Sequence, residues 1–420
     1  MLPWWVLVLG CGSTTLRGIA VTAMIVNIET AQPAAPKNRC GDLYRNGSSG
    51  TERLKVLQVG KFYDPYRGGM ETVLKNLCEG IHSYVDLHLL VANTSFRTVH
   101  EQQAFPITRV ASWGKLFSSS LTPSFATWLR KLPGDIIHVH MPNPVAEVSY
   151  LMAGGRRPLV AHFHSDIVRQ KSLLRAYAPL LESFYRRASR IIVPTPNHIS
   201  VSPFVSGFRD KCRVVPFGIS VEKFDYTETI ARRVAQLRDG RTAILFIGRL
   251  VYYKGIEYLL QAMRDLPARL WIIGTGPLEA GLKQLSTRLG LQDKVEFLGD
   301  VPEDDLPAYY HSCDMLALPS IANSEMFGMV QLEAAACRKP VVSTNLPTGV
   351  SWVNQHGVTG LLVPPKDARA LVMAMRALLE SRSMREELGE AGRRRIETEF
   401  TIAGMTQGIL EVYQDIRKEY

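Results

Sequence analysis

One stretch, residues 315–344, constrains the fold of this chain more than any other part of its sequence. It begins with a short apolar run, passes through a polar loop that carries Glu325, and ends in a second apolar run. In between, the spacing of apolar residues becomes helical from about Phe327, and the helix is expected to stop near Pro340 because proline cannot continue it. The pattern predicts a strand, a helix and a second strand, with Glu325 in the loop and Glu333 about one and a half turns inside the helix.

This arrangement of acids and helix suits a nucleotide diphosphate that carries a sugar. The free N–H groups at the start of a helix bind anions such as phosphate. Glu325, in the loop beside that site, is placed to accept hydrogen bonds from sugar hydroxyls, and Glu333 is placed to reach a ribose. The alternative is an ordinary surface helix that carries two solvated glutamates, because glutamates eight residues apart also occur by chance.

Length and composition favour a two-domain α/β protein with reduced thiols. At 420 residues the chain is long for one hydrophobic core, so two domains are expected. Its 46% hydrophobic and 21% charged residues are ordinary for such an enzyme. The six cysteines are scattered, with no C-x-x-C pair and no metal-ligand spacing. This usage indicates reduced cytosolic thiols and a cytoplasmic protein.

Apolar runs alternate with helix-like stretches along most of the chain, beginning with the run at 54–59. Such alternation predicts a parallel, doubly wound sheet. A polar segment, 219–241, interrupts the alternation and predicts a hinge, after which the pattern resumes. The further strands expected before this hinge are 87–92, 135–140, 158–164, 190–194 and 212–218.

Three features besides the two glutamates are candidates for ligand binding. Gly68-Gly69 precedes a helix-like stretch, and glycines there allow the backbone to approach a ligand closely, although a plain loop is the alternative. Arg249 and Lys254 flank a strand-to-helix turn, where two cations suit a diphosphate, although basic pairs at turns are usually surface charges. The G-x-G-x-x-G-like string 274–279 ends in glutamate, so the dinucleotide fingerprint is incomplete.

Two histidine pairs have the H-x-H spacing of a metal site. His138 and His140 form one pair and His162 and His164 the other, and alternate residues of a strand point to the same face. No carboxylate or cysteine nearby in the sequence completes a ligand set, so we do not expect a metal.

The motif E-x-F-G-x-x-x-x-E-A-x-A-x-x-x-P-V-V resembles the retaining glycosyltransferases of family 4, also called glycosyl transferases group 1. The G-R-L-x-x-x-K-G string at 248–255 resembles the same family, and the likeness covers roughly residue 54 to the C-terminus. It implies the GT-B fold: two Rossmann-like, doubly wound parallel-sheet lobes with an interdomain cleft. The expected division is an acceptor-binding lobe at 51–225, a nucleotide-sugar lobe at 226–400 and a helix at 401–420 that crosses back to the first lobe.

The resemblance also implies the roles of individual residues. His164 matches a histidine that contacts the donor sugar, and Gly68-Gly69 matches a glycine loop over the donor phosphates. His164, Glu325, Arg249 and Lys254 are the implied catalytic residues. The implied donor site consists of Gly68, Gly69, Arg249, Lys254, Val301 at the turn that contacts the base, Glu325, Phe327, Gly328, Met329, Val330 and Glu333.

The implied activity is transfer of a hexose, such as mannose or glucose, from a nucleotide diphosphate sugar to a glycan or lipid-linked acceptor, with retention of configuration. Biosynthesis of cell-surface polysaccharide, lipopolysaccharide or glycolipid is the expected setting. No metal or other cofactor is expected, since the sequence contains no D-x-D. The alternatives are a GT-B epimerase or phosphorylase, whose own signatures are not visible, and a non-catalytic sugar-nucleotide-binding protein.

The net charge of +10 bears on partners. Residues 51–240 carry 25 Lys and Arg against 15 Asp and Glu, a surplus of +10, while 241–420 carry 20 against 22. The basic first lobe, with the cation-flanked helical stretch 165–190 and the aromatic segment 113–132, suggests peripheral contact with an anionic membrane. No nucleic-acid motif is visible. Residues 1–50 have the composition of a disordered extension, too short in apolar sequence to span a bilayer.

Overall fold

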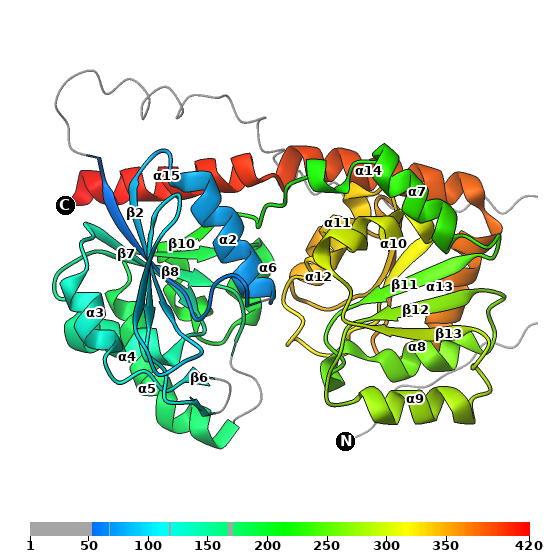
Figure 1. The fold of residues 1–420 in the computed structure, drawn as a ribbon, viewed down its shortest axis with the longest axis horizontal. Helices are drawn as coiled ribbons and strands as arrows, with labels where there is room; N and C mark the ends of the chain where they lie inside the picture. The colour runs from blue at the N-terminus through cyan, green and yellow to red at the C-terminus, as the bar shows by residue number, and fades with distance from the viewer. Residues whose placement is uncertain (1–52, 67, 117–118, 167–170) are drawn as a thin grey trace, which may run out of the picture. The chain divides into compact units, whose positions relative to one another are not determined.

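The computed structural model describes residues 53–66, 68–116, 119–166 and 171–420 of the chain. The expected extension at 1–50 lies outside these residues, as does Arg169, and the side chains of 171–176 are also outside the described part. Two sheets dominate the structure, one wholly parallel and one parallel except for an edge pair, and helices cover both faces of each (Figure 1). None of the helices in the described part is long and apolar enough to cross a membrane.

The first sheet has the strand order β10-β9-β8-β7-β1-β2-β4-β3. All neighbours are parallel except β3 and β4, an antiparallel edge pair that the sequence pattern did not predict. The strand order reverses between β1 and its neighbours β2 and β7, which is where open α/β sheets bind ligands. Its strands are β1 (Lys55–Val59), β2 (Asp86–Ala92), β3 (Val99–Gln102), β4 (Pro106–Val110), β7 (Ile136–Met141), β8 (Leu159–Phe163), β9 (Arg190–Val193) and β10 (Cys212–Val214).

The first sheet is buried on both faces, because its central strands consist almost wholly of apolar and histidine side chains. A short antiparallel pair, β5 (Lys115–Leu116) with β6 (Ser119–Ser120), lies outside the sheet. The helices of this part are α2 (Gly69–Ile81), α3 (Phe125–Lys131), α4 (Pro144–Ala153), α5 (Lys171–Arg187) and α6 (Pro196–Val201).

The second sheet is wholly parallel, with the order β13-β12-β11-β14-β15-β16. Here the order reverses between β11 and β14, so the loops that follow these two strands meet at one edge of the sheet. Its strands are β11 (Ala243–Ile247), β12 (Arg269–Ile273), β13 (Val295–Gly299), β14 (Met315–Leu318), β15 (Val341–Thr344) and β16 (Gly360–Val363). Its helices are α7 (Glu228–Leu237), α8 (Ile256–Met263), α9 (Glu279–Arg288), α10 (Leu306–Ser312), α11 (Val330–Ala336), α12 (Gly349–Val353), α13 (Ala368–Glu380) and α14 (Arg382–Glu399).

The C-terminal helix α15 (Ile402–Glu419) packs against α2 of the first sheet (Figure 1). Leu74 and Leu77 of α2 lie in the same buried cluster as Ile409 and Tyr413 of α15. The apolar residues of α15 recur at helical spacing, so this face is buried against the first sheet's outer layer.

Candidate active site

The site begins with a buried ion pair at the point where the second sheet reverses its strand order. The Lys254 Nζ lies 2.6 Å from Glu325 Oε2, and the two side chains are only 10% and 9% exposed. Ser320 Oγ donates a hydrogen bond of 2.9 Å to the same carboxylate oxygen. Lys254 ends the short 3₁₀ turn after β11 and Glu325 lies in the loop after β14, so neighbouring strands bring together two residues 71 positions apart. The sequence predicted both residues but not their contact.

Hydrogen bonds from the start of α12 hold the backbone of the loop that carries Glu325. Thr348 Oγ1 donates to the carbonyl of Glu325 at 2.8 Å, and the Gly349 N–H donates to the carbonyl of Met326 at 2.8 Å. Thr344 Oγ1 donates to the Ser320 carbonyl at the other end of the loop. These bonds fix the position of the loop relative to the sheet, and therefore the position of the Glu325 side chain.

Lys254 folds over a glycine at the end of β11. A Cβ on Gly248 would lie 3.2 Å from the Nζ of Lys254, so a larger residue would displace the amine. Gly274 and Gly276, from the incomplete dinucleotide fingerprint, pack against this same loop. Their Cβ atoms would lie 2.2 Å and 2.4 Å from the carbonyls of Gly248 and Leu250. These glycines therefore serve close packing between two loops.

The side chain of Arg249 is exposed, and its guanidinium makes no ion pair or hydrogen bond within the described residues, although the Arg249 carbonyl accepts from the Val251 N–H at 2.9 Å. Arg249 follows β11, and its predicted contact with a phosphate stays a prediction.

The helix that carries Glu333 begins later than the sequence predicted. Helix α11 starts at Val330, because Gly328 has a left-handed backbone (φ 76°) that breaks the helical run expected from Phe327. Glu333 consequently lies in the first turn of α11, and the prediction of one and a half turns was wrong. The N–H groups of Gly328, Met329 and Val330 donate no hydrogen bond within the described part of the chain.

Glu333 is held by a residue that the sequence did not single out. The hydroxyl of Tyr310, fully buried in α10, donates a 2.6 Å hydrogen bond to Glu333 Oε2. Burial raises the pKa of Glu333, and the hydrogen bond from Tyr310 opposes that rise. Val301, predicted to contact the base, packs against the cluster that contains Tyr310.

His164 lies at the end of β8 in the first sheet. Its ring stacks on Phe217 at 5.0 Å, and its Nε2 lies 2.9 Å from His140 Nδ1. The ring is 8% exposed, and burial holds its pKa well below the usual range, so His164 is neutral. Gly68 and Gly69 lie in this part too, at the N-terminus of α2. A Cβ on Gly68 would lie 2.3 Å from Glu71 Oε2, whereas Gly69 has open space.

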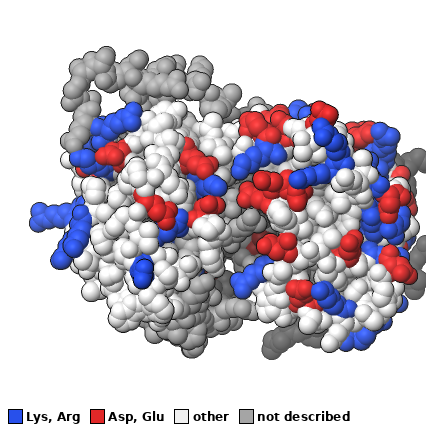
Figure 2. Space-filling view, in the orientation of Figure 1, with Lys and Arg blue, Asp and Glu red and all other residues white. Residues whose placement is uncertain are grey.

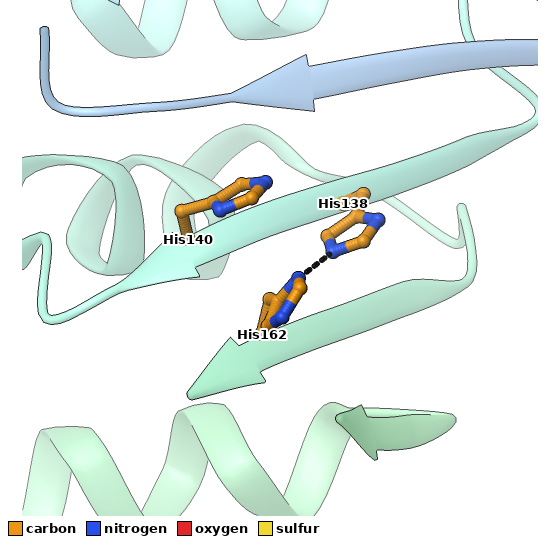
Figure 3. Close-up of side chains that lie close together, drawn as sticks. All are labelled: His138, His140 and His162. Carbon is orange, nitrogen blue, oxygen red and sulfur yellow. Dashed lines mark hydrogen bonds between the residues drawn. The ribbon is translucent and has the colours of Figure 1, made fainter. Parts of the chain in front are cut away.

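Nitrogen atoms of His138, His140 and His162 lie within 4.8 Å of one another, close enough for these residues to hold a metal ion (Figure 3). All three side chains are completely buried; His138 is hydrogen-bonded to His162 and to Gln58, and His140 is hydrogen-bonded to Gln58. Burial lowers the pKa of each ring, which leaves neutral imidazoles of the kind that metals bind. No carboxylate or thiolate lies in the cluster to offset a divalent charge.

Both parts of the chain match glycosyltransferase families. The family described as glycosyl transferases group 1 matches residues 227–395, and glycosyltransferase family 4 matches residues 67–223. The D-rhamnosyltransferase WbpZ of Pseudomonas aeruginosa is 34% identical over 355 residues, covering 82% of this chain and 92% of that protein. The O-antigen chain mannosyltransferase C of Escherichia coli is 33% identical, covering 86% of this chain and 98% of that protein. The chain belongs to glycosyltransferase family 4.

This family 4 glycosyltransferase has the GT-B fold. Sucrose-phosphate synthase from Thermosynechococcus elongatus superposes with a TM-score of 0.74 at 20% identity, covering 88% of this chain and all of that one. Anabaena HepE in complex with UDP-glucose superposes with a TM-score of 0.71 at 20% identity, covering 86% of this chain and all of that one. The predicted family, fold and enzyme class are confirmed, and nothing supports the epimerase, phosphorylase or non-catalytic alternatives.

Proposed function

We propose that this glycosyltransferase moves a hexose from a nucleotide diphosphate sugar to a glycan or lipid-linked acceptor in the biosynthesis of cell-surface polysaccharide or glycolipid. The two relatives described above are named for rhamnose transfer and for mannose transfer to O-antigen, which supports this setting. The observation that carries the proposal is the buried Lys254–Glu325 pair, followed in the chain by the N–H groups of 328–330, which donate no hydrogen bond within the described residues. It offers positive charge and amide donors for a diphosphate, and a carboxylate for sugar hydroxyls.

In this proposal the arriving diphosphate competes with Glu325 for Lys254. The donor phosphates take the ammonium of Lys254 and the guanidinium of Arg249, which together stabilise the charge that develops on the leaving group. Glu325 is then released to accept hydrogen bonds from the sugar, while Glu333 holds the ribose with the carboxylate oxygen that Tyr310 leaves free. His164 contacts the sugar from the first lobe.

We infer further that transfer retains the anomeric configuration. A donor phosphate oxygen takes the proton of the acceptor hydroxyl on the same face of the sugar, so no protein nucleophile is required. No metal is needed, because Lys254 and Arg249 supply the positive charge. Proton NMR of the first product formed tests the configuration, and turnover should persist in excess EDTA.

The donor is identified by screening the full-length protein with GDP- and UDP-linked hexoses and deoxyhexoses, read by release of nucleotide diphosphate. We expect one or a few donors to be turned over, faster when a lipid-linked glycan acceptor is added. The names of the Pseudomonas and Escherichia coli relatives make nucleotide-linked rhamnose and mannose the first donors to try. A protein that released no nucleotide diphosphate from any donor with any acceptor would contradict the proposal.

We also propose peripheral contact with an anionic membrane on the cytoplasmic side, on narrower grounds. Most described cations around α5 have protein partners: Arg186 pairs with Glu182, Arg190 pairs with Glu419, and Arg187 donates to the carbonyls of Leu151 and Gly155. Figure 2 likewise shows Lys and Arg scattered over the first sheet on the face drawn. Better support comes from the described apolar side chains at the two ends of the segment 113–121, which are exposed.

Within that segment Trp113 is 66% exposed and Leu121 is 45% exposed, at the base of the β5–β6 hairpin. Exposed aromatic and aliphatic side chains of this kind insert at a lipid interface. Binding to anionic vesicles should weaken with salt, because charges are screened over about 8–10 Å at 0.1–0.15 M. The variant Trp113→Ser should bind these vesicles less tightly. Equal binding to neutral and anionic vesicles, or none to either, would remove this idea.

A further inference from the structure

A buried ladder of histidines leads from His164 into the centre of the first sheet. His138 and His140 lie on β7 and His162 on β8, with His140 and His162 in register and His164 just beyond the end of β8. Neighbouring rings lie 4.8–5.1 Å apart between centroids. Figure 3 shows the three innermost rings and the hydrogen bond between His138 and His162.

One amide, Gln58 at the end of β1, connects the two halves of this ladder. Its Oε1 lies 3.0 Å from His140 Nε2, while its Nε2 lies 3.2 Å from His138 Nδ1 and donates to the Tyr413 hydroxyl at 2.8 Å. Gln58 is completely buried and adjoins His138 in the register of β1 and β7. An amide oxygen only accepts and an amide nitrogen only donates, so Gln58 imposes a direction on each hydrogen bond it makes.

The donor-to-acceptor direction that Gln58 imposes also determines the hydrogen bond between His140 and His164. Because the oxygen of Gln58 accepts, the Nε2 of His140 must carry the proton, and the Nδ1 of a neutral His140 therefore holds a lone pair. The Nδ1 of His140 lies 2.9 Å from His164 Nε2. Since Nδ1 is the acceptor in this hydrogen bond, His164 Nε2 must be the protonated nitrogen. His164 is left with its lone pair on Nδ1, ready to accept a hydrogen bond.

The second branch of the ladder, from Gln58 through His138 to His162, ends in the protein interior. The Nδ1 of His138 accepts from Gln58 and lies 2.6 Å from the hydroxyl of Tyr413, so its Nε2 carries the proton and donates to His162 Nδ1 at 3.1 Å. His162 Nε2 is then the protonated atom, and it has no hydrogen-bond partner within the described residues. A buried donor left without a partner is rare in proteins, and here it follows from the direction that Gln58 sets.

We propose that Gln58 is a positioning residue for sugar transfer, which holds His164 through His140 as the Nε2–H tautomer with an acceptor nitrogen at Nδ1. This proposal rests on the proposed function, because His164 is assigned there to the donor sugar. The group that His164 Nδ1 meets is accordingly a hydrogen-bond donor, such as a sugar hydroxyl. Gln58 itself does not touch substrate.

The tautomers can be read directly by two-bond ¹H–¹⁵N NMR of the full chain labelled with ¹⁵N-histidine, which has ten histidines to assign by single substitutions. We expect His164, His140, His138 and His162 to show the neutral Nε2–H pattern between pH 6 and 8. An Nδ1–H pattern or a charged ring at His164 would overturn the proposal. Stoichiometric zinc in elemental analysis would also overturn it, since a metal would replace the ring-to-ring hydrogen bonds.

Three variants separate positioning from a structural role. Gln58→Met keeps the volume but removes the amide, so His164 should show both tautomers and kcat should fall by about 10-fold, the lower end for supporting residues, while the donor KM changes by less than about 3-fold. Gln58→Glu keeps an acceptor for His140 and should restore the His164 pattern and part of kcat. Tyr413→Phe removes the hydroxyl that accepts from Gln58 Nε2 but keeps the Gln58 Oε1 that accepts from His140, so it should leave the His164 pattern unchanged.

These readouts keep the proposal distinct from the proposed function. A chain without transfer activity would contradict the function while leaving the NMR prediction to be decided by itself. A Gln58→Met variant with mixed His164 tautomers but unchanged kcat would overturn the positioning role for transfer.

Discussion

Lys254 and Glu325 form a pair whose partners depend on each other. Both side chains are at most a tenth exposed, and removing one member of such a buried pair leaves an uncompensated charge that costs about 3–5 kcal/mol. Loss of activity in a Lys254 or Glu325 variant therefore has to be separated from loss of folding.

The two glutamates of the motif should behave differently when their charge is removed. If Glu325 contacts the sugar and Glu333 the ribose, as proposed above, Glu325→Gln should lower kcat because it removes a charge that would support a cationic transition state. Glu333→Gln should instead raise the KM for donor and weaken binding of free nucleotide. Loss of a charge-assisted hydrogen bond costs about 1.5–3 kcal/mol, or roughly 10- to 150-fold. Steady-state kinetics of both variants, with thermal unfolding as the control, checks this. The opposite pattern would reverse the two roles.

Glu147 gives a pH dependence that can be traced to one residue. Complete burial raises its pKa to about 7, against the lowering effect of hydrogen bonds from the Tyr177 hydroxyl and the Asn143 N–H. The folded state therefore holds this proton more tightly than the unfolded state, and stability falls as pH rises from about 4.5 through 7. The loss is up to about 3 kcal/mol at pH 8. Glu147→Gln should flatten the urea unfolding free energy between pH 6 and 8; a slope unchanged from wild type would contradict this.

At the scale of elements, the sequence predicted the strands well and the starts of helices less well. The runs at 54–59, 135–140 and 158–164 became β1, β7 and β8 within a residue or two, because buried parallel strands are continuous apolar segments. The start of α11 was misplaced because Phe327 fits a helical spacing, and only the backbone shows that Gly328 ends the loop there. Tyr310 gave no signal at all, since a buried tyrosine in a helix is usually a core residue.

The turn at Gly328 should be sensitive to a single methyl group. In Gly328→Ala the new Cβ would lie 2.7 Å from Leu318 Cδ2 with φ at 76°, so both strain and overpacking are expected. Gly357→Ala is the matched control, because φ there is 71° but no atom lies within 4 Å of the new Cβ. Chemical denaturation should show Gly328→Ala to be less stable than Gly357→Ala by about 1–2 kcal/mol. Equal losses would mean that the turn tolerates a side chain.

The neutral histidines buried in the first sheet should make the folded protein less stable at acidic pH. Burial lowers the pKa of His162 to about 3 and lowers the pKa of His138, His140 and His164 in the same direction. The unfolded state thus binds more protons below about pH 6.5, and stability falls as pH falls toward 3. His162 alone accounts for about 2 kcal/mol at pH 5.

Urea unfolding at pH 5, 6 and 7 measures this acid sensitivity. We expect the unfolding free energy to drop by at least about 2 kcal/mol between pH 6.5 and 5, with Glu147 opposing the drop, so the effect should be larger in Glu147→Gln. A protein equally stable at pH 5 and 7 in that variant would show that the histidines are protonated without penalty.

At the level of the whole molecule, the sequence motif predicted a donor site around one strand–helix–strand unit, and this stays a prediction. The histidine ladder was beyond such reasoning: Gln58 and Tyr413 are 355 positions apart and meet only because α15 packs on α2. Hydrogen bonds between distant elements leave no local pattern, so the sequence predicted the two H-x-H pairs but not what connects them.

The role of the Lys254–Glu325 pair in donor turnover is tested most directly by the variant Lys254→Met. With the donor that wild type accepts, acceptor-dependent release of nucleotide diphosphate should fall at least about 100-fold, as loss of a charge-assisted contact to the leaving group predicts. Circular dichroism should still show a folded protein at the assay temperature. Lys283→Met, which removes an exposed lysine paired with Glu279 at 2.7 Å, is the control and should keep wild-type turnover. A folded Lys254→Met protein with turnover within a few-fold of wild type would contradict the account.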